Sequence, residues 1–200
     1  MKGMEMGSAL LERRDAVVRL LSERSGAIVV SGLGSATYDV AAAGDNDRNF
    51  YLWGAMGGAA MIGLGIALAQ PDVPVIVVTG DGEMLMGLGG FATISQKNPA
   101  NLTVVVLDNE LYGETGEQHS HTSKGADLGA VAAACGIRDV RTVRSFDELA
   151  VLAARSGSVG EATTVAVVKI DPGETPRVLP SRDGALIKTK VRASLGLDSM

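Results

Sequence analysis

Residues 73–109 read VPVIVVTGDGEMLMGLGGFATISQKNPANLTVVVLDN, and this stretch decides the fold class. Its two valine-rich segments, 73–79 and 102–107, are typical of buried parallel strands. The apolar segment 84–94 has the length of a helix, so the stretch predicts a strand, helix, strand crossover. The same alternation continues along the chain. We therefore expect an α/β fold: a doubly wound, mostly parallel sheet of about six strands with helices on both faces.

Polar residues directly follow both of these strands. Gly80-Asp81-Gly82 comes after the first, and Asp108-Asn109 comes after the second. The carboxyl ends of parallel strands form the ligand-binding edge of such sheets, so the crossover should bring Asn109 beside Asp81 although they lie 28 positions apart (109 minus 81). A carboxylate and an amide oxygen suit Mg²⁺, which often shares its ligands with a phosphate. The alternative is that Asp81 only caps the next helix and Asn109 only fills a turn.

The composition limits the class of protein. The formal net charge is -5 and the chain has no basic cluster, which disfavours a nucleic-acid partner. Cys135 is the only cysteine and cannot form an internal disulfide, which fits a reducing compartment. The uncharged segment 57–70 has only 14 residues, too few to cross a bilayer, and the N-terminus has no signal-peptide layout. We expect a cytoplasmic protein without a membrane partner.

The rest of the chain continues the alternation of helices and strands. The 17-residue loop at 109–125 is long enough to be a working part of the protein. Ser145 with Glu148 predicts a capping box at the start of a helix. From residue 171 onward we expect a basic, extended or loosely helical tail outside a core at 25–170, all within one domain, 1–200. Further helices are expected at 9–23, from 35 to about 44, at 57–70 and at 127–134, and further strands at 27–31, 140–143 and 163–170.

Three motifs in order resemble thiamine diphosphate (ThDP) enzymes. Gly80-Asp81-Gly82 with Asn109 is similar to their diphosphate and metal motif. Gly54-Ala55-Met56-Gly57 lies 25 positions before Asp81 (81 minus 56), where decarboxylases of that superfamily have a turn that holds the aminopyrimidine. The stretch 108–118, DNELYGETGEQ, resembles sulfopyruvate and phosphonopyruvate decarboxylases. The resemblance extends over roughly residues 25–170 and implies a ThDP pyrophosphate-binding domain.

The resemblance implies a set of cofactor ligands. Mg²⁺ would be held by Asp81, the Asn109 side chain and the backbone oxygen of Leu111, together with the diphosphate. The backbone N–H groups of Gly82 and Glu83 would face the diphosphate. Glu83 departs from the commonest decarboxylase pattern, which has Ser, and its carboxylate must turn away or serve another role. The implied cofactor-binding residues are Gly54, Ala55, Met56, Gly80, Asp81, Gly82, Glu83, Asn109, Leu111, Tyr112 and Gly113.

The glycine turn carries its own expectation. By resemblance, the side chain of Met56 lies beneath the thiazolium ring and forces the bent cofactor conformation, while the backbone oxygen of Gly54 accepts from the 4'-amino group. The alternative for Met56 is simple core packing. A dinucleotide fold competes for these glycines, but the G-x-G-x-x-G spacing is absent.

The long loop holds three candidate catalytic residues: Glu114, His119 and His121. The histidines are the only two in the chain, and histidine suits proton transfer near neutral pH. Glu114 lies near the position where related decarboxylases have an acid. The alternatives are that all three are solvated loop residues, or that the two histidines bind a metal.

The 200-residue chain has room for only one of the two domains that the resemblance implies. ThDP enzymes need a glutamate at N1' of the aminopyrimidine, and a separate pyrimidine-binding domain carries it. The chain therefore resembles the β subunit of a two-subunit, ThDP- and Mg²⁺-dependent 2-oxo acid decarboxylase of the sulfopyruvate or phosphonopyruvate type, which yields an aldehyde and CO₂. An α subunit would supply the glutamate in a hetero-oligomer, with 57–70 and 84–91 at the interface. The alternatives are a ThDP-dependent carboligase or oxidoreductase subunit, or a non-catalytic ThDP-binding subunit.

Overall fold

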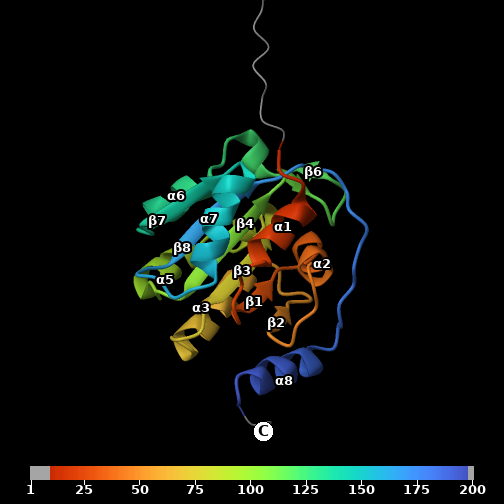
Figure 1. The fold of residues 1–200 in the computed structure, drawn as a ribbon. Helices are drawn as coiled ribbons and strands as arrows, with labels where there is room; N and C mark the ends of the chain where they lie inside the picture. The colour runs from red at the N-terminus through yellow and green to blue at the C-terminus, as the bar shows by residue number, and fades with distance from the viewer. Residues whose placement is uncertain (1–9, 198–200) are drawn as a thin grey trace, which may run out of the picture.

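The computed structural model of this chain describes residues 10–197, and a parallel sheet lies at its centre (Figure 1). The strands are β1 (Ile28–Ser31), β2 (Asn49–Tyr51), β3 (Val75–Gly80), β4 (Leu102–Asp108), β5 (Leu111–Tyr112), β6 (Gln118–His119), β7 (Asp139–Val143) and β8 (Thr164–Lys169). Six of them form one sheet in the order β2-β1-β3-β4-β8-β7, and every neighbouring pair is parallel. The short strands β5 and β6 form a separate antiparallel hairpin.

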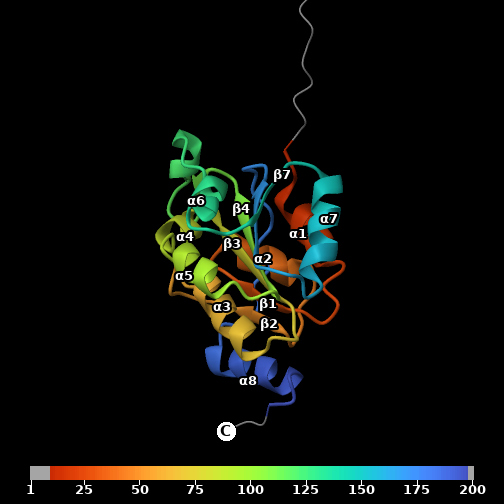
Figure 2. The ribbon, with the colours of Figure 1, turned by 90° about the vertical axis from the view of Figure 1, so that its left-hand side faces the viewer.

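Helices cover both faces of the sheet, as Figure 2 shows edge-on. They are α1 (Arg13–Leu21), α2 (Ser35–Ala42), α3 (Ala59–Ala69), α4 (Asp81–Met86), α5 (Gly90–Lys97), α6 (Leu128–Ala134), α7 (Phe146–Ser156) and α8 (Gly184–Ser194), with the 3₁₀ helix η1 (His121–Lys124). One hydrophobic core joins helices α1, α2 and α7 to one face of the sheet. A second core joins the helices α3, α4, α5 and α6 to the opposite face. The expected doubly wound α/β architecture is confirmed.

The two cores explain the valine-rich strands. Side chains alternate across a strand, so Ile76 and Val78 of β3 enter one core while Val75 and Val77 enter the other. All four are fully buried. A strand that is buried on both faces needs an unbroken apolar run, and this is the pattern the sequence shows.

The crossover between β3 and β4 differs from the prediction of one helix at 84–94. The structure has two helices, α4 and α5, separated at Gly87 and Gly89. Gly87 lies directly against the glycine turn, because a Cβ built on it would be 2.3 Å from the backbone oxygen of Gly57. Only a residue without a side chain allows this approach. The contact lies where α4 ends, and at its other end α4 begins at Asp81, within the polar motif itself.

The capping box agrees with the sequence, whereas one helix and the long loop differ from the prediction. Ser145 and Glu148 form the expected capping box, and Asp127 caps α6. The helix expected at 9–23 is shorter, since α1 begins at Arg13, and residue 9 lies outside the described part of the chain. The loop 109–125 is more ordered than expected because it contains the β5–β6 hairpin and η1. None of the helices within residues 10–197 has both the length and the apolar character needed to cross a membrane.

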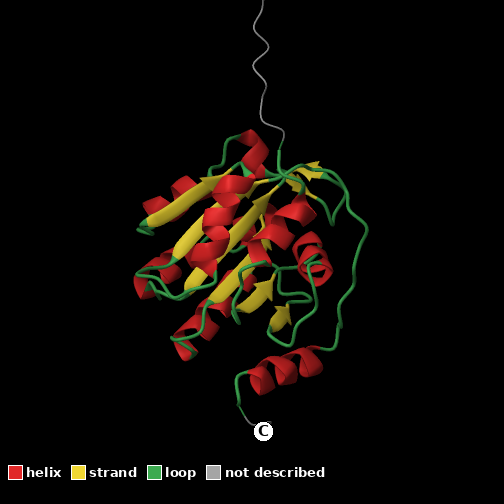
Figure 3. Cartoon of the chain, viewed as in Figure 1, coloured by secondary structure: helices red, strands yellow, loops and turns green. Residues whose placement is uncertain are grey.

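The tail combines an extended strap, residues 171–183, with the regular helix α8 (Figure 3). The strap runs past α2, and α8 packs beside β2. The indole Nε1 of Trp53 donates to the backbone oxygen of Ser181 at 2.7 Å, and the guanidinium of Arg182 lies 4.9 Å from the centre of the same ring. The strap therefore contacts the residue that immediately precedes the glycine turn.

Candidate cofactor site

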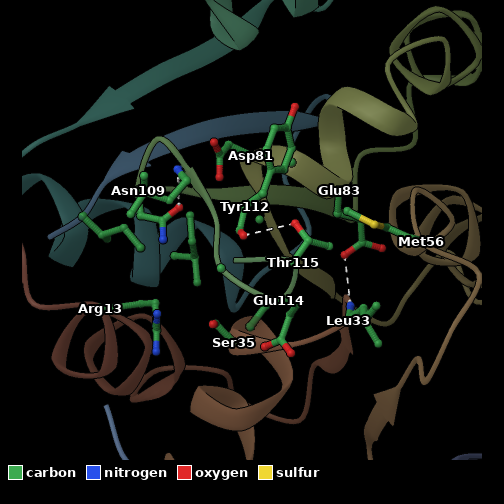
Figure 4. Close-up of a pocket in the computed structure, with 17 residues that line it drawn as sticks. Arg13, Leu33, Ser35, Met56, Asp81, Glu83, Asn109, Tyr112, Glu114 and Thr115 are labelled. Carbon is green, nitrogen blue, oxygen red and sulfur yellow. Dashed lines mark hydrogen bonds between the residues drawn. The ribbon is translucent and has the colours of Figure 1, made fainter. Parts of the chain in front are cut away.

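A cavity of about 140 Å³ lies at the carboxyl edge of the sheet (Figure 4). It collects residues from the ends of β3 and β4, the loop after β1, the glycine turn and the β5 hairpin. A second cavity of about 430 Å³ shares Ser35, Asn109 and Glu114 with it and extends under the strap. The predicted site residues that line the first cavity are Met56, Gly80, Asp81, Gly82, Glu83, Asn109, Leu111, Tyr112, Gly113 and Glu114.

Asp81 is buried at the end of β3, with 2% of its surface exposed. Its Oδ2 accepts hydrogen bonds from Ser120 and, at 3.1 Å, from Thr122. The Thr122 hydroxyl also lies 2.8 Å from Oδ1 of Asp108 and 2.8 Å from the Ser120 hydroxyl. These bonds tie the 109–125 loop to the ends of both central strands.

The Asp81 network has more polar contacts than protons. Ser120 and Thr122 each carry one hydroxyl proton. Those two protons must serve four oxygen–oxygen contacts, two of which involve Asp81. Burial raises the pKa of Asp81 and the nearby Asp108 charge raises it further, while the hydroxyl bonds oppose the shift. The raised pKa and the shared hydroxyl protons make this network a place that can accept a proton or a cation.

Lys169 balances the second carboxylate. The register of β4 and β8 pairs Asp108 with Lys169, and Nζ lies 2.7 Å from Oδ2 of Asp108 and 2.7 Å from Oε1 of Glu110. Burial alone would lower the pKa of Lys169, but the bonds to the two carboxylates raise it. We did not identify Lys169 from sequence. Its position at the polar end of a β-branched strand was the available signal.

Asn109 forms a turn, as the alternative interpretation of the sequence predicted. Its Oδ1 accepts from the backbone N–H of Leu111 at 3.1 Å, so it does hold a turn. Glu110 within this turn has a φ of 63°, an uncommon value for a residue with a side chain. An amide oxygen has a second lone pair, so the turn leaves Oδ1 able to bind a cation.

The glycine turn is held in a strained conformation. Gly54 has φ 110°, Ala55 φ 47° and Gly57 φ 88°. The left-handed region is unfavourable for Ala55, and such strain concentrates at functional sites. The turn presents Met56 to the cavity with 39% of its surface exposed, so simple core packing does not describe this side chain.

Glu83 turns away from Asp81, as Figure 4 shows. Its carboxylate accepts from the backbone N–H of Leu33 at 3.1 Å and from Thr79 Oγ1 at 2.9 Å. It also accepts from the backbone N–H of Gly57 at 3.3 Å. Burial raises the pKa of Glu83, and these bonds oppose the shift. The Glu83 carboxylate therefore bonds the loop after β1, the glycine turn and β3.

Comparison with known proteins adds the family. The sequence profile described as "Thiamine pyrophosphate enzyme, C-terminal TPP binding domain" matches residues 32–168. The chain belongs to the thiamine pyrophosphate enzyme family. Thiamine pyrophosphate (TPP) is another name for ThDP, so the family resemblance seen in the sequence is confirmed, and the matched region of this TPP binding domain contains both the glycine turn and Asp81.

Relatives of this TPP binding domain include two named decarboxylases. Phosphonopyruvate decarboxylase of Streptomyces viridochromogenes is 42% identical over 172 residues, which is 83% of this chain and 43% of that protein. Sulfopyruvate decarboxylase subunit beta of Methanocaldococcus jannaschii is 41% identical over 138 residues, which is 68% of this chain and 72% of that subunit. The chain thus spans less than half of the first relative and most of the second.

A solved structure supports the same fold. An enzyme of Mycobacterium smegmatis, described as thiamin diphosphate-dependent, matches with a TM-score of 0.67 and 26% identity. The match covers 82% of this chain and 32% of that chain. The TPP binding domain therefore corresponds to about a third of that longer enzyme.

The candidate catalytic residues occupy different parts of the TPP binding domain. Glu114 lines the main cavity and lies over Gly34 at the start of α2. His121 is exposed, and its Nδ1 is 2.7 Å from the hydroxyl of Tyr112. His119 is exposed on β6 and lines a separate cavity with Lys169. Neither histidine lines the main cavity, but His121 is connected to it through the ring of Tyr112.

The two histidines do not form a metal site of their own. Within residues 10–197, no group of three or more His, Cys, Asp or Glu side chains is arranged to hold a metal ion. A cation at Asp81 would therefore need the Asn109 amide, a backbone oxygen or the cofactor's phosphates to complete its ligands.

Proposed function

We propose that this chain binds ThDP with Mg²⁺ and serves as the β subunit of a cytoplasmic 2-oxo acid decarboxylase. One observation carries the proposal: the buried carboxylate of Asp81 and the Met56 side chain of the strained glycine turn line the same cavity. We further propose that residues 1–200 form a single pyrophosphate-binding domain, in which α1 and α8 add buried residues to the expected core at about 25–170.

The residues at the sheet edge fit the cofactor. Asp81, Asn109 and the backbone oxygen of Leu111 would hold Mg²⁺, and the N–H groups of Gly82 and Glu83 would lie near the diphosphate. A Cβ on Gly82 would be 2.6 Å from the ring of Tyr112, so the tyrosine packs directly over this position. When bound, ThDP supplies the carbanion-stabilising chemistry, whereas the chain binds, orients and encloses it.

A partner subunit is proposed to complete the site. Apart from Asp81, the carboxylates that line the main cavity are Glu83, which is held by three donors, and Glu114, which lies over α2. Neither is placed at the glycine turn as a free acid for the aminopyrimidine. We propose that an α subunit with a pyrimidine-binding domain supplies that glutamate. The relative from Methanocaldococcus jannaschii is itself named a beta subunit.

The surface beside the glycine turn supports a protein partner. Met56, Met61 and Leu68 expose 39%, 38% and 48% of their surface, and Met86 exposes 66%. These side chains lie on the glycine turn, α3 and α4, where the sequence predicted an interface. Exposed apolar patches of this kind often mark protein interfaces. A hetero-oligomer would cover them and close the cofactor cavity.

The proposed substrate is a small 2-oxo acid, with sulfopyruvate and phosphonopyruvate as the first candidates because relatives named for these substrates are about 40% identical. We propose that His121, Glu114 and His119 handle protons or recognise the substrate. The loop that carries them starts at the proposed metal site, and His121 is coupled to Tyr112 in the cavity wall.

The deciding experiment assays the chain with and without a candidate α subunit. We expect weak ThDP binding and no turnover from the chain alone, and release of CO₂ and an aldehyde from one of the two substrates in the complex. Turnover by demonstrably single-component protein would overturn the subunit assignment. Product analysis with an acceptor aldehyde or an electron acceptor separates decarboxylation from carboligation and oxidation.

A further inference from the structure

The carboxylate of Glu83 is a buried charge without a counter-ion. The residue exposes 4% of its surface, and none of the ion pairs between described residues involves it. Burying a carboxylate is unfavourable unless its oxygens are fully bonded. Its burial therefore depends on the donors that surround it.

Three segments converge on this carboxylate. Leu33 follows β1, Gly57 ends the glycine turn and Thr79 lies in β3, and each donates one hydrogen bond to Glu83. The segments are separated by more than 20 positions along the chain, since 57 minus 33 is 24 and 79 minus 57 is 22. The backbone N–H of Ala59, at the start of α3, is a further donor to this carboxylate. Because all of these partners are donors, the group at their centre must be an acceptor.

The structure reserves space for the carboxylate. A Cβ built on Gly32 would lie 1.6 Å from Oε2 of Glu83, so no larger residue fits at position 32 while the glutamate is in place. Glu83 lies two positions after Asp81 in the short helix α4. One helix therefore connects the proposed metal ligand to the group that holds the glycine turn.

We infer that Glu83 is a positioning residue that fixes the strained glycine turn, and with it Met56, relative to the metal and diphosphate end of the site. This inference rests on the proposed function. The Gly57 N–H bond restrains the end of a turn in which Ala55 has a φ of 47°. Without that restraint the turn can relax, and the two ends of the cofactor are no longer held at a set separation.

The test compares two probes on the full-length chain. ThDP with Mg²⁺ reports on both ends of the site, whereas inorganic pyrophosphate with Mg²⁺ reports on the metal and diphosphate end alone. Trp53 is the only tryptophan and precedes the turn, so its fluorescence can follow ThDP binding. Calorimetry measures both probes. Glu161→Gln removes an exposed glutamate far from these contacts in sequence and serves as the matched control.

For Glu83→Gln we expect ThDP to bind at least about tenfold more weakly. The amide has only one acceptor oxygen, so its NH₂ group would face at least one of the donors that the carboxylate now binds. Pyrophosphate affinity should change by less than about twofold. A role in general stability would lower both affinities alike. Equal ThDP affinity in Glu83→Gln and wild type, or parallel loss of both probes, would overturn the inference.

A second variant separates the volume that the Glu83 carboxylate fills from the hydrogen bonds that it accepts. In Glu83→Ala combined with Gly32→Ala, the new methyl group occupies part of the volume that the carboxylate leaves. We expect this double variant to fold with a lowered melting temperature, because the buried donors lose their acceptor. ThDP affinity should stay as low as in Glu83→Gln, while pyrophosphate affinity stays close to that of wild type. Wild-type ThDP affinity in the folded double variant would overturn the inference. Failure of wild type itself to bind ThDP would instead overturn the proposed function.

Discussion

Replacing Asp81 with asparagine should change stability and cofactor binding in opposite directions. Both hydroxyl bonds of the network end on one oxygen, Oδ2. An asparagine with its carbonyl oxygen at that point keeps both bonds and removes the charge, although one acceptor oxygen is replaced by a donor near the backbone N–H of Gly82. Its amino group would take the place of Oδ1. The variant therefore isolates the effect of the charge at a site that is 2% exposed.

The magnitude follows from burial and the neighbouring charge. Removing a buried carboxylate without a direct cation should stabilise the metal-free chain by on the order of 1 to 3 kcal/mol at pH 8. The pKa of Asp81 is raised above its ordinary value of 3.8 by burial and by Asp108. A raised pKa means that wild type keeps the contribution of Asp81 below about pH 4 and loses it as the pH rises through the folded-state value. The difference between variant and wild type should therefore vanish in acid and grow toward pH 8.

Mg²⁺ with ThDP should offset this difference in stability or reverse it. At a concentration of 100 times its Kd, a ligand stabilises the folded state by about 2.7 kcal/mol. Wild type should gain this stabilisation from Mg²⁺ with ThDP, and Asp81→Asn should gain none because the only charged metal ligand is lost. Urea unfolding followed by circular dichroism, in EDTA and in Mg²⁺ with ThDP at several pH values, measures both effects.

Two results would refute this reasoning. If Asp81→Asn were less stable than wild type in EDTA at pH 8, the carboxylate would be stabilising and the proton count wrong. If Mg²⁺ with ThDP stabilised the variant as much as wild type, Asp81 would not be a metal ligand.

Four further predictions test other parts of the site. Lys169→Met should destabilise the chain by about 3 kcal/mol at neutral pH, because it leaves Asp108 buried without its cation; a loss below about 1 kcal/mol in urea unfolding would contradict this. Asn109→Ala should lower Mg²⁺-dependent ThDP affinity in calorimetry by at least about tenfold, and unchanged affinity would remove this residue from the metal site. Met56→Ala should keep ThDP affinity within about threefold while turnover of the assembled enzyme falls at least about tenfold, so turnover equal to that of wild type would argue against a Met56 side chain beneath the thiazolium ring. His121→Ala should lower the decarboxylation rate at least about tenfold at nearly constant ThDP affinity, and kinetics within about twofold of wild type would make it a solvated loop residue.

The fold was predictable because its strongest determinants are local. Strands that are buried on both faces require continuous β-branched runs, and β3 and β4 begin and end within about two residues of the predicted limits. The adjacency of Asp81 and Asn109 followed from the same signal, because a crossover between parallel strands returns the chain to the same edge. The single helix at 84–94 was wrong because contact between Gly87 and Gly57, not local pattern, ends α4.

The histidines show where sequence reasoning about the site ended. Their residue type and loop position predicted a role in proton transfer, but residue type does not determine direction. His119 lies in β6 and lines a cavity with Lys169, whereas His121 lies two positions later in η1 and contacts Tyr112. The main cavity is instead lined by Glu114 of the same loop.

The sequence by itself determined the α/β class, the family and the positions of Asp81, Asn109 and the glycine turn, because hydrophobic period and motif spacing are encoded in neighbouring residues. Only the tertiary structure decided which residues far apart in the sequence form ion pairs and hydrogen bonds with one another. The pairing of Asp108 with Lys169 depends on β4 and β8 being neighbours in the sheet. The three donors around Glu83 come from segments that meet only after the sheet has formed. Electrostatic contacts depend on distance in space and burial, and neither quantity is fixed by separation along the chain.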